Sequence, residues 1–355
     1  MTSTYYMQQL PQWVIDFNNQ HLVNKYYEQG WNLLYPLSTY SQSTEDEKKY
    51  ENKLFGNSFP YNLSAFVNKD FGKIASTPMG NTLTTEYAKA VIAGEQLGRS
   101  GTTDMLTVSY SSTDYVGHSF GPNSVEQEDD FLRLDRELGS LLDYLDAKIG
   151  KNQYVVFLSA DHGVAHVPEY LNEHHMPGGR FMIGDFMRQL NKGLAEKFNT
   201  PNLVVSDDNY QIHFNHKLID SAGLDEEKIT SYVIGQLSAN PAIARAFPLQ
   251  QLNTTPLPET VRGMLNNGYY TNRSGDVQFI LKPGFIEGYS NTGTTHGLWN
   301  PYDAHIPLLW YGWGIKQGKT IRETYMTDIA PTIATLLHIQ VPNGCIGHPI
   351  AEVLR

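Results

Sequence analysis

The pattern of apolar positions predicts alternating helices and strands in the first half of the chain. Residues 80–98 repeat apolar side chains at helical spacing, which predicts an amphipathic helix. A short apolar run at 104–110 predicts a buried strand, and the three-and-four spacing over 127–149 predicts a long helix with one buried face. The continuous apolar run at 154–158 is typical of a strand covered on both faces in a parallel sheet. Strand, helix and strand in this order predict a βαβ unit.

Polar loops are predicted directly after both strands of this unit. The first loop, residues 111–124, contains Asp114 and His118. The second begins with the run SADHG and contains Asp161 and His162. In α/β sheets, ligands bind in the loops beyond the carboxyl ends of the strands. We therefore expect these four side chains to lie at one edge of the sheet.

The second half of the chain has a different character until the regular pattern resumes near the end. Shorter mixed segments include a predicted helix over 181–190 and a predicted hairpin over 268–285. The apolar run at 306–311 predicts a further strand of the main sheet. A final helix is predicted over 327–337. This order indicates an insertion into an α/β domain.

The chain has 355 residues, which is long enough for one large domain with a smaller domain inserted into it. We predict an α/β fold in which a mostly parallel sheet is flanked by helices. The predicted core consists of residues 1–179 and 291–355, and the predicted inserted α+β subdomain spans residues 180–290. The charged stretch over 41–52 predicts an exposed loop or helix end.

Charge and cysteine content narrow the classes of partner and of metal site. The formal net charge of −11 argues against nucleic acid or an anionic membrane surface as a partner. Cys345 is the only cysteine, so an intrachain disulfide and a thiolate metal cluster are excluded. No run approaches the roughly 18 apolar residues of a membrane span, and the first residues lack the pattern of a signal peptide. Any metal must therefore be held by nitrogen and oxygen ligands.

Five residues are candidate metal ligands: Asp114 with His118, Asp161 with His162, and His296. Carboxylates and imidazoles form the mixed oxygen and nitrogen set that suits a zinc-like ion. His296 lies in the Gly- and Thr-rich loop NTGTTHGLWNP, after the predicted insertion. Taken singly, each motif also suits a capped turn or an exposed loop histidine. Taken together, they favour a pair of ions roughly 3.5–4 Å apart, as used in displacement reactions at phosphorus.

Longer runs around these residues resemble a known family. The runs TDYVGHSFGP (113–122), SADHG (159–163) and THG (295–297) resemble the alkaline phosphatase superfamily, including its nucleotide pyrophosphatases and phosphodiesterases of type I. The stretch TPMGNTLTTEYAKAVIAGEQLG (77–98) and the run KYYEQGWNLLYP near the start are most similar to the phosphate-irrepressible alkaline phosphatases. The similarity covers nearly the whole chain.

The resemblance implies a zinc-dependent phosphate monoester hydrolase with an alkaline-phosphatase-like fold, acting through a phosphorylated Thr or Ser. It implies that Asp114, His118 and His296 hold one Zn²⁺, and that Asp161 and His162 supply half of the ligands of a second. In the family, the remaining carboxylate and the nucleophile precede the segment that resembles this chain. We therefore expect the chain to correspond to the C-terminal two-thirds of such a phosphatase and to be inactive by itself.

Alternative functions remain open at this point. A phosphodiesterase or nucleotide pyrophosphatase of the same superfamily shares the metal ligands, and an inactive metal-binding fragment is a third interpretation. A sulfatase is disfavoured because its nucleophile motif is absent from the sequence. Four hydroxyl residues neighbour the ligands and are interpreted as structural: Thr113, Ser159, Thr294 and Thr295. The resemblance also implies small phosphate esters as substrates and a periplasmic or secreted location.

Overall fold

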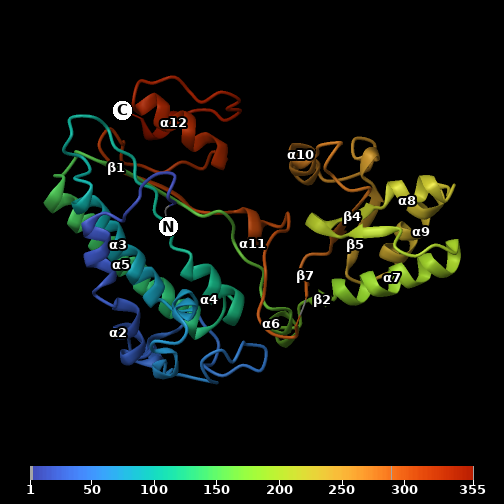
Figure 1. Cartoon of the computed structure of the whole chain (residues 1–355), viewed down its shortest axis with the longest axis horizontal. Helices are drawn as coiled ribbons and strands as arrows, with labels where there is room; N and C mark the ends of the chain where they lie inside the picture. Colours follow the sequence, from blue (N-terminus) through green and yellow to red (C-terminus); the bar gives the residue numbers. More distant parts are fainter. Residues whose placement is uncertain (1–2, 289, 355) are drawn as a thin grey trace.

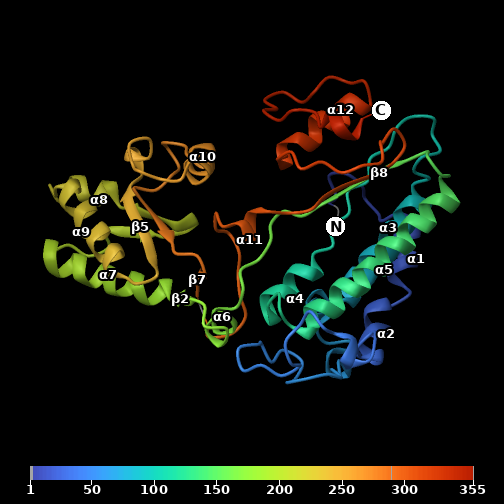
Figure 2. The same ribbon diagram turned by 180° about the vertical axis from the view of Figure 1, so that it is seen from behind.

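Two bodies of unequal size make up the fold, which is described here from a computed structural model for residues 3–288 and 290–354. Figure 1 shows a larger body formed by the two ends of the chain, beside a smaller body formed by the middle of the chain. The strands β2 (Gly179–Phe181) and β7 (Phe285–Glu287) pair in parallel where the chain passes between the bodies. Figure 2 shows the same arrangement from behind.

The larger body is built mainly from helices. Its helices and strands in chain order are α1 (Gln12–Asn18), α2 (Leu22–Gln29), α3 (Met79–Gly94), α4 (Ser112–Phe120), α5 (Val125–Lys148), β1 (Val155–Ser159), α6 (Pro168–Glu173), α11 (Pro301–Ala304), β8 (Leu308–Gly312) and α12 (Ile329–Leu336). Its 3-10 helices are η1 (Leu37–Thr39), η2 (Ser64–Phe66), η3 (Phe71–Ser76), η6 (Met326–Asp328) and η7 (Ala351–Val353). The helices predicted over 80–98, 127–149 and 327–337 are thus confirmed by α3, α5 and α12.

The start of α5 is set by its own sequence. The Ser124 side chain accepts a hydrogen bond from the backbone N–H of Gln127, and Glu126 and Glu128 lie in the first turn, where they complement the helix dipole. Helices α3 and α4 both pack against α5. The deeply buried residues of α5 lie in its first turns, whereas Phe131 on the predicted apolar face is exposed. The other residues of the predicted face are half-buried, so the face is partly covered rather than fully buried: Leu134, Leu138, Leu141, Leu142, Leu145 and Ile149.

The strands predicted over 154–158 and 306–311 are confirmed as β1 and β8. They pair antiparallel, with Val155 opposite Gly312 and Ser159 opposite Leu308, and β1 is half-buried along its length. The α/β fold class with flanking helices is confirmed, and the described parallel pairing is that of β2 with β7, outside the segments for which a parallel sheet is predicted. The direction of the β1–β8 pair differs from the prediction because an apolar run specifies a strand but not the direction of its neighbour.

The segment before α4 also differs from its prediction. Residues 104–110 form no ladder within the described part of the chain, and Met105 and Leu106 are exposed. The polar segment that follows is not a loop, because Ser112–Phe120 forms α4. Its Ser, Thr and Gly residues have low helix propensity, and packing against α5 outweighs that preference.

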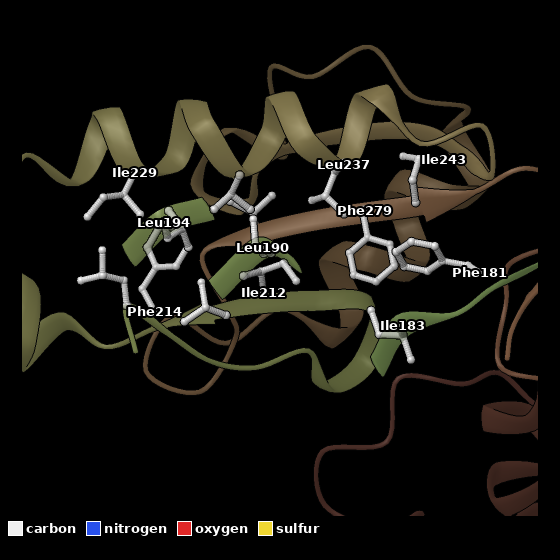
Figure 3. Packing of buried hydrophobic residues seen from close by; sticks show 14 of the residues in the cluster. Phe181, Ile183, Leu190, Leu194, Ile212, Phe214, Ile229, Leu237, Ile243 and Phe279 are labelled. Carbon is white, nitrogen blue, oxygen red and sulfur yellow. The ribbon is translucent and has the colours of Figure 1, made fainter. Parts of the chain in front are cut away.

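The smaller body is an α+β unit with its own hydrophobic core. Its helices and strands are α7 (Ile183–Phe198), β3 (Val204–Ser206), η4 (Asp208–Tyr210), β4 (Gln211–Phe214), α8 (His216–Ser221), α9 (Glu226–Ala239), β5 (Ile243–Pro248), η5 (Leu249–Gln251), α10 (Glu259–Gly268) and β6 (Val277–Leu281). The strands form an antiparallel sheet in the order β3-β4-β6-β5. Figure 3 shows Leu190 and Leu194 of α7 and Ile229 and Leu237 of α9 packing with Phe279 of this sheet.

The predicted helix over 181–190 is confirmed by α7, but the predicted hairpin over 268–285 is wrong. Strand β6 pairs with β4 and β5, whereas β7 pairs with β2. Strands that are adjacent in the sequence pair with each other most often. Here β7 instead pairs with β2, at the connection between the two bodies. Within the described ranges, no helix is both long and apolar enough to cross a membrane.

Candidate metal centre

Helix α4 carries the first pair of candidate ligands on one face. Asp114 lies in its first turn and His118 in its last, four residues apart, so the two side chains are neighbours on the helix surface. The helix sits close to α5, since a Cβ added at Gly117 would come within 3.2 Å of Gln127 Oε1. The position of this ligand pair is therefore fixed by the packing of α4 on α5.

The second pair follows the end of β1. Asp161 and His162 lie two and three residues beyond Ser159, the last residue of the strand. The turn is held by the N–H of Gly163, which donates to the carbonyl of Asp303 at 2.6 Å. A β-carbon at position 163 would lie 2.1 Å from a backbone oxygen of the adjacent helix α11, so only glycine allows this close approach.

The loop that carries His296 is bonded to both of the other ligand segments. The Thr294 N–H donates to the His118 carbonyl at 3.0 Å, and the Thr294 hydroxyl donates to the Ala165 carbonyl at 2.8 Å. Gly293 has φ of +69°, and a Cβ there would meet the His118 carbonyl at 2.2 Å. These bonds hold the loop that follows β7, including His296, against α4.

The three imidazoles converge on one carboxylate oxygen. The distances from Asp114 Oδ1 are 3.5 Å to His118 Nε2, 3.9 Å to His162 Nε2 and 3.8 Å to His296 Nε2. The rings of His162 and His296 stack, with centroids 3.4 Å apart. Ligand atoms of Asp114, His162 and His296 all lie within 4.8 Å of one another. The structure thus brings together residues that are up to 182 positions apart in the sequence, from Asp114 to His296.

Hydrogen bonds fix which nitrogen of two imidazoles is available to a metal. His118 Nδ1 lies 2.8 Å from the Thr294 carbonyl, and His162 Nδ1 lies 2.8 Å from the Gly163 carbonyl. A carbonyl only accepts, so each Nδ1 carries the proton and each Nε2 keeps a free lone pair. Both free Nε2 atoms face Asp114. This is the arrangement in which a backbone partner orients a metal-binding histidine.

Electrostatics also favour a neutral imidazole at His296. Burial lowers the pKa of His296, and the neighbouring rings of His162 and His118 lower it further. A neutral imidazole is the form that binds a metal ion. Asp161 is the least enclosed of the five residues, with its side chain 87% exposed, and its Oδ2 lies 3.6 Å from His162 Nε2. The donor set of nitrogen and carboxylate oxygen fits a zinc-like ion.

Hydroxyl groups beside the ligands have structural partners. The Thr113 hydroxyl donates to Asp130 Oδ2 at 2.7 Å, and the Ser159 hydroxyl donates to the Pro307 carbonyl at 2.9 Å. The Thr294 hydroxyl is bonded to the Ala165 carbonyl, as described above. These bonds support the interpretation of the three hydroxyls as structural groups.

Sequence reasoning missed Asp303, a buried carboxylate next to the centre. Burial raises the pKa of Asp303 to about 6, and the nearby His162 opposes this rise. The preceding Asn300 and Pro301 are a helix-start signal, since Pro stands at the first position of α11. That signal predicts the short helix, but no pattern of residue types indicates that its third residue faces the ligand loops.

The fold and the site together define an α/β protein with a candidate divalent-metal centre made of imidazole and carboxylate groups. Comparison with known proteins gives the family: the type I phosphodiesterase / nucleotide pyrophosphatase family matches residues 4–303, and the chain belongs to it. The resemblance to the alkaline phosphatase superfamily is thereby confirmed.

Individual relatives are similar over the whole of this chain. Alkaline phosphatase PafA of Elizabethkingia meningoseptica is 44% identical over 358 residues, and alkaline phosphatase PhoV of Synechococcus elongatus is 46% identical over 359 residues. These matches cover 100% of this chain but 65% and 64% of the two relatives. The crystal structure of wild-type PafA matches with a TM-score of 0.96 at 44% identity, covering 100% of this chain and 68% of that chain.

Proposed function

We propose that this chain provides the zinc centre of a phosphate monoester hydrolase of the alkaline phosphatase type. The observation that carries the proposal is the convergence of three imidazole Nε2 atoms on Asp114 Oδ1. An ordinary structural role for these side chains does not require three imidazoles around one carboxylate. The names of PafA and PhoV, both alkaline phosphatases, support the monoester as the substrate class.

The five residues divide between two ions in this proposal. Asp114, His118 and His296 hold one Zn²⁺, and Asp161 and His162 supply half of the ligands of a second. Asp114 Oδ1 lies between both sets, since its distances to His118 and to His162 differ by less than half an ångström, at 3.5 and 3.9 Å. A shared position of this kind suits two neighbouring ions.

Zinc bound here supplies positive charge that neutralises phosphoryl oxygens and lowers the pKa of bound water to about 7. The residues of the chain bind the ions and orient the imidazole ligands. Thr294 and Gly163 hold the protons of His118 and His162 on Nδ1, so that both Nε2 atoms stay available. The complete hydrolase acts through a phosphorylated Thr or Ser, and we assign that role to none of the hydroxyls with structural partners.

Metal content tests the centre directly. The purified chain is expected to retain zinc, measured by elemental analysis after exchange into chelator-treated buffer. Replacing His118 and His296 together with alanine should abolish retention, whereas replacing His348, an exposed histidine outside the candidate metal-binding groups, should not. A chain that binds no zinc under any loading condition contradicts the proposed centre.

Substrate class is tested separately on the zinc-loaded chain. We expect inorganic phosphate, the product of a monoesterase, to bind more tightly than dimethyl phosphate, because two metal ions favour the larger negative charge. Isothermal titration calorimetry measures both affinities. Equal or tighter binding of dimethyl phosphate favours the alternative, a phosphodiesterase of the same family. Turnover of p-nitrophenyl phosphate at the rate of PafA contradicts our assignment of the three hydroxyls.

The domain boundaries and the location remain proposals too. We propose that residues 180–290 form the inserted subdomain and that residues 1–179 and 291–355 form the core. Limited proteolysis of the intact chain is expected to cut first near the two boundaries. We also propose a periplasmic or secreted location, which fractionation of the native cells with a cytoplasmic marker enzyme tests.

A further inference from the structure

Asp303 connects the two loops that carry three of the five candidate ligands. It is the third residue of α11 and is 3% exposed. Its backbone carbonyl accepts the N–H of Gly163 at 2.6 Å, directly after His162. Its carboxylate Oδ2 accepts the N–H of Leu298 at 2.8 Å, two residues after His296. One residue therefore bonds to the backbone of both loops.

Close packing leaves this junction little freedom to shift. A Cβ added at Gly163 would lie 2.1 Å from the carbonyl oxygen of Tyr302, the residue before Asp303. The Tyr302 hydroxyl in turn accepts hydrogen bonds from Asn300 Nδ2 at 2.7 Å and from the Gly284 N–H at 3.1 Å. Helix α11 is thus held on two sides. A movement of α11 is transmitted to the turn after β1.

The Leu298 N–H gives the Asp303 side chain a role that other acceptors do not fill. This hydrogen bond is buried, so water cannot replace the carboxylate if the side chain is shortened. An unpaired buried donor is costly, and the loop relieves that cost by moving toward solvent. Because Leu298 is two residues from His296, such a movement displaces the imidazole.

We propose that Asp303 is a positioning residue of the metal centre, which sets the spacing of His162 and His296 by bonding to both loops. It acts through the Gly163 and Leu298 backbone and is not itself a ligand. The stacked rings of the two histidines, with centroids 3.4 Å apart, are the contact that this spacing determines. The inference rests on the proposed function, because it concerns the same centre.

The test compares zinc affinity in three variants of the full chain. Asp303→Ala removes the carboxylate that accepts the Leu298 N–H. We expect zinc affinity to fall about 10- to 100-fold, as for other partners that orient metal ligands. Asp303→Asn keeps an acceptor oxygen for Leu298 and is expected to bind zinc as the unaltered chain does. Competition with a chromophoric zinc chelator measures each dissociation constant.

Asp328→Ala is the matched control for loss of stability alone. Asp328 is 4% exposed, and its carboxylate accepts backbone N–H groups of Tyr325 at 3.0 Å and His348 at 2.8 Å, in a different part of the larger body. This variant is expected to unfold at a lower temperature with unchanged zinc affinity. A general loss of stability therefore does not imitate the effect expected at Asp303.

Each outcome decides between the claims. If the unaltered chain binds no zinc, the proposed centre is refuted, and this inference falls with it. If the unaltered chain binds zinc and Asp303→Ala binds it equally well, only the positioning role is overturned. Equal weakening by Asp303→Asn also overturns it, because charge rather than the hydrogen bond then matters. If Asp303→Ala does not fold, Gly163→Ala perturbs the same junction from the other loop, and unchanged affinity there overturns the inference.

Discussion

Glu51 is a buried carboxylate whose ionisation opposes folding at alkaline pH. It is 5% exposed, and its Oε2 accepts the Lys48 N–H at 3.1 Å, while Oε1 has no hydrogen-bond partner among the described residues. Burial, assisted by the negative charge of Glu126, raises the pKa of Glu51 from 4.5 to about 8. At neutral pH, the folded chain therefore holds a proton that the unfolded chain has released.

The size of the effect follows from this pKa difference. Between pH 4.5 and about 8 the folded chain binds more protons than the unfolded chain, so stability falls as pH rises through that window. One pKa unit corresponds to about 1.4 kcal/mol, which sets an upper limit of about 5 kcal/mol on the loss. Above the window both states are ionised, and the loss is complete. Glu51→Gln removes the charge at nearly constant shape and should remove this loss.

Urea unfolding at pH 5, 7 and 9, followed by circular dichroism, measures the effect. We expect Glu51→Gln to match the unaltered chain near pH 5 and to exceed its unfolding free energy by several kcal/mol at pH 9. Glu45→Gln, in the same segment but with a side chain 90% exposed, is the control and should change nothing. Burial raises the pKa of Glu126 to about 7, so the unfolding free energy of Glu51→Gln still falls with pH, but less steeply. The reasoning is refuted if Glu51→Gln loses as much stability between pH 5 and 9 as the unaltered chain.

Three further predictions concern stability. Thr113→Val removes the hydroxyl that donates to buried Asp130 and accepts from Asn81, so the free energy of unfolding should fall by roughly 1–3 kcal/mol in urea titrations. Arg180→Met leaves Glu169 without its two-pronged partner and should cost a similar amount, while the further change Glu169→Gln should recover part of it in a double-mutant cycle. Removal of bound zinc by a chelator should lower the melting temperature measured by calorimetry, and no change would mean that the metal does not bind the folded chain preferentially.

Local patterns predicted the elements that depend on a single segment. The helices α3, α5 and α7 and the strands β1 and β8 follow from apolar spacing. The direction of the strands does not follow from apolar spacing, because the antiparallel pairing of β1 with β8 depends on a segment about 150 residues away in the chain. For the same reason, the apolar run at 104–110 predicts a buried strand, although this segment has no ladder partner in the described residues.

The burial of an individual charged residue could likewise not be predicted from the sequence. The stretch over 41–52 is rich in Glu, Asp and Lys, which predicts an exposed segment, yet Tyr50 and Glu51 are buried. Residues from elsewhere in the chain lie against them: the Gly293 N–H donates to the Tyr50 carbonyl, and the charge of Glu126 acts on Glu51. Composition reports the average exposure of a segment, whereas a single carboxylate is buried by its particular neighbours.

The metal ligands could be predicted from the sequence, whereas the groups that support them could not, and the reason is chemical. Metal binding requires particular side chains, so Asp and His at the ends of predicted strands are informative as residue types. The supports found here act largely through backbone atoms, such as the Gly163 N–H, the Asp303 carbonyl and the Thr294 carbonyl. Every residue carries such atoms, so no residue type marks them. It follows that support residues of this centre are best found from contacts, and that the expected effect of replacing Asp303 rests on its side-chain bond to Leu298.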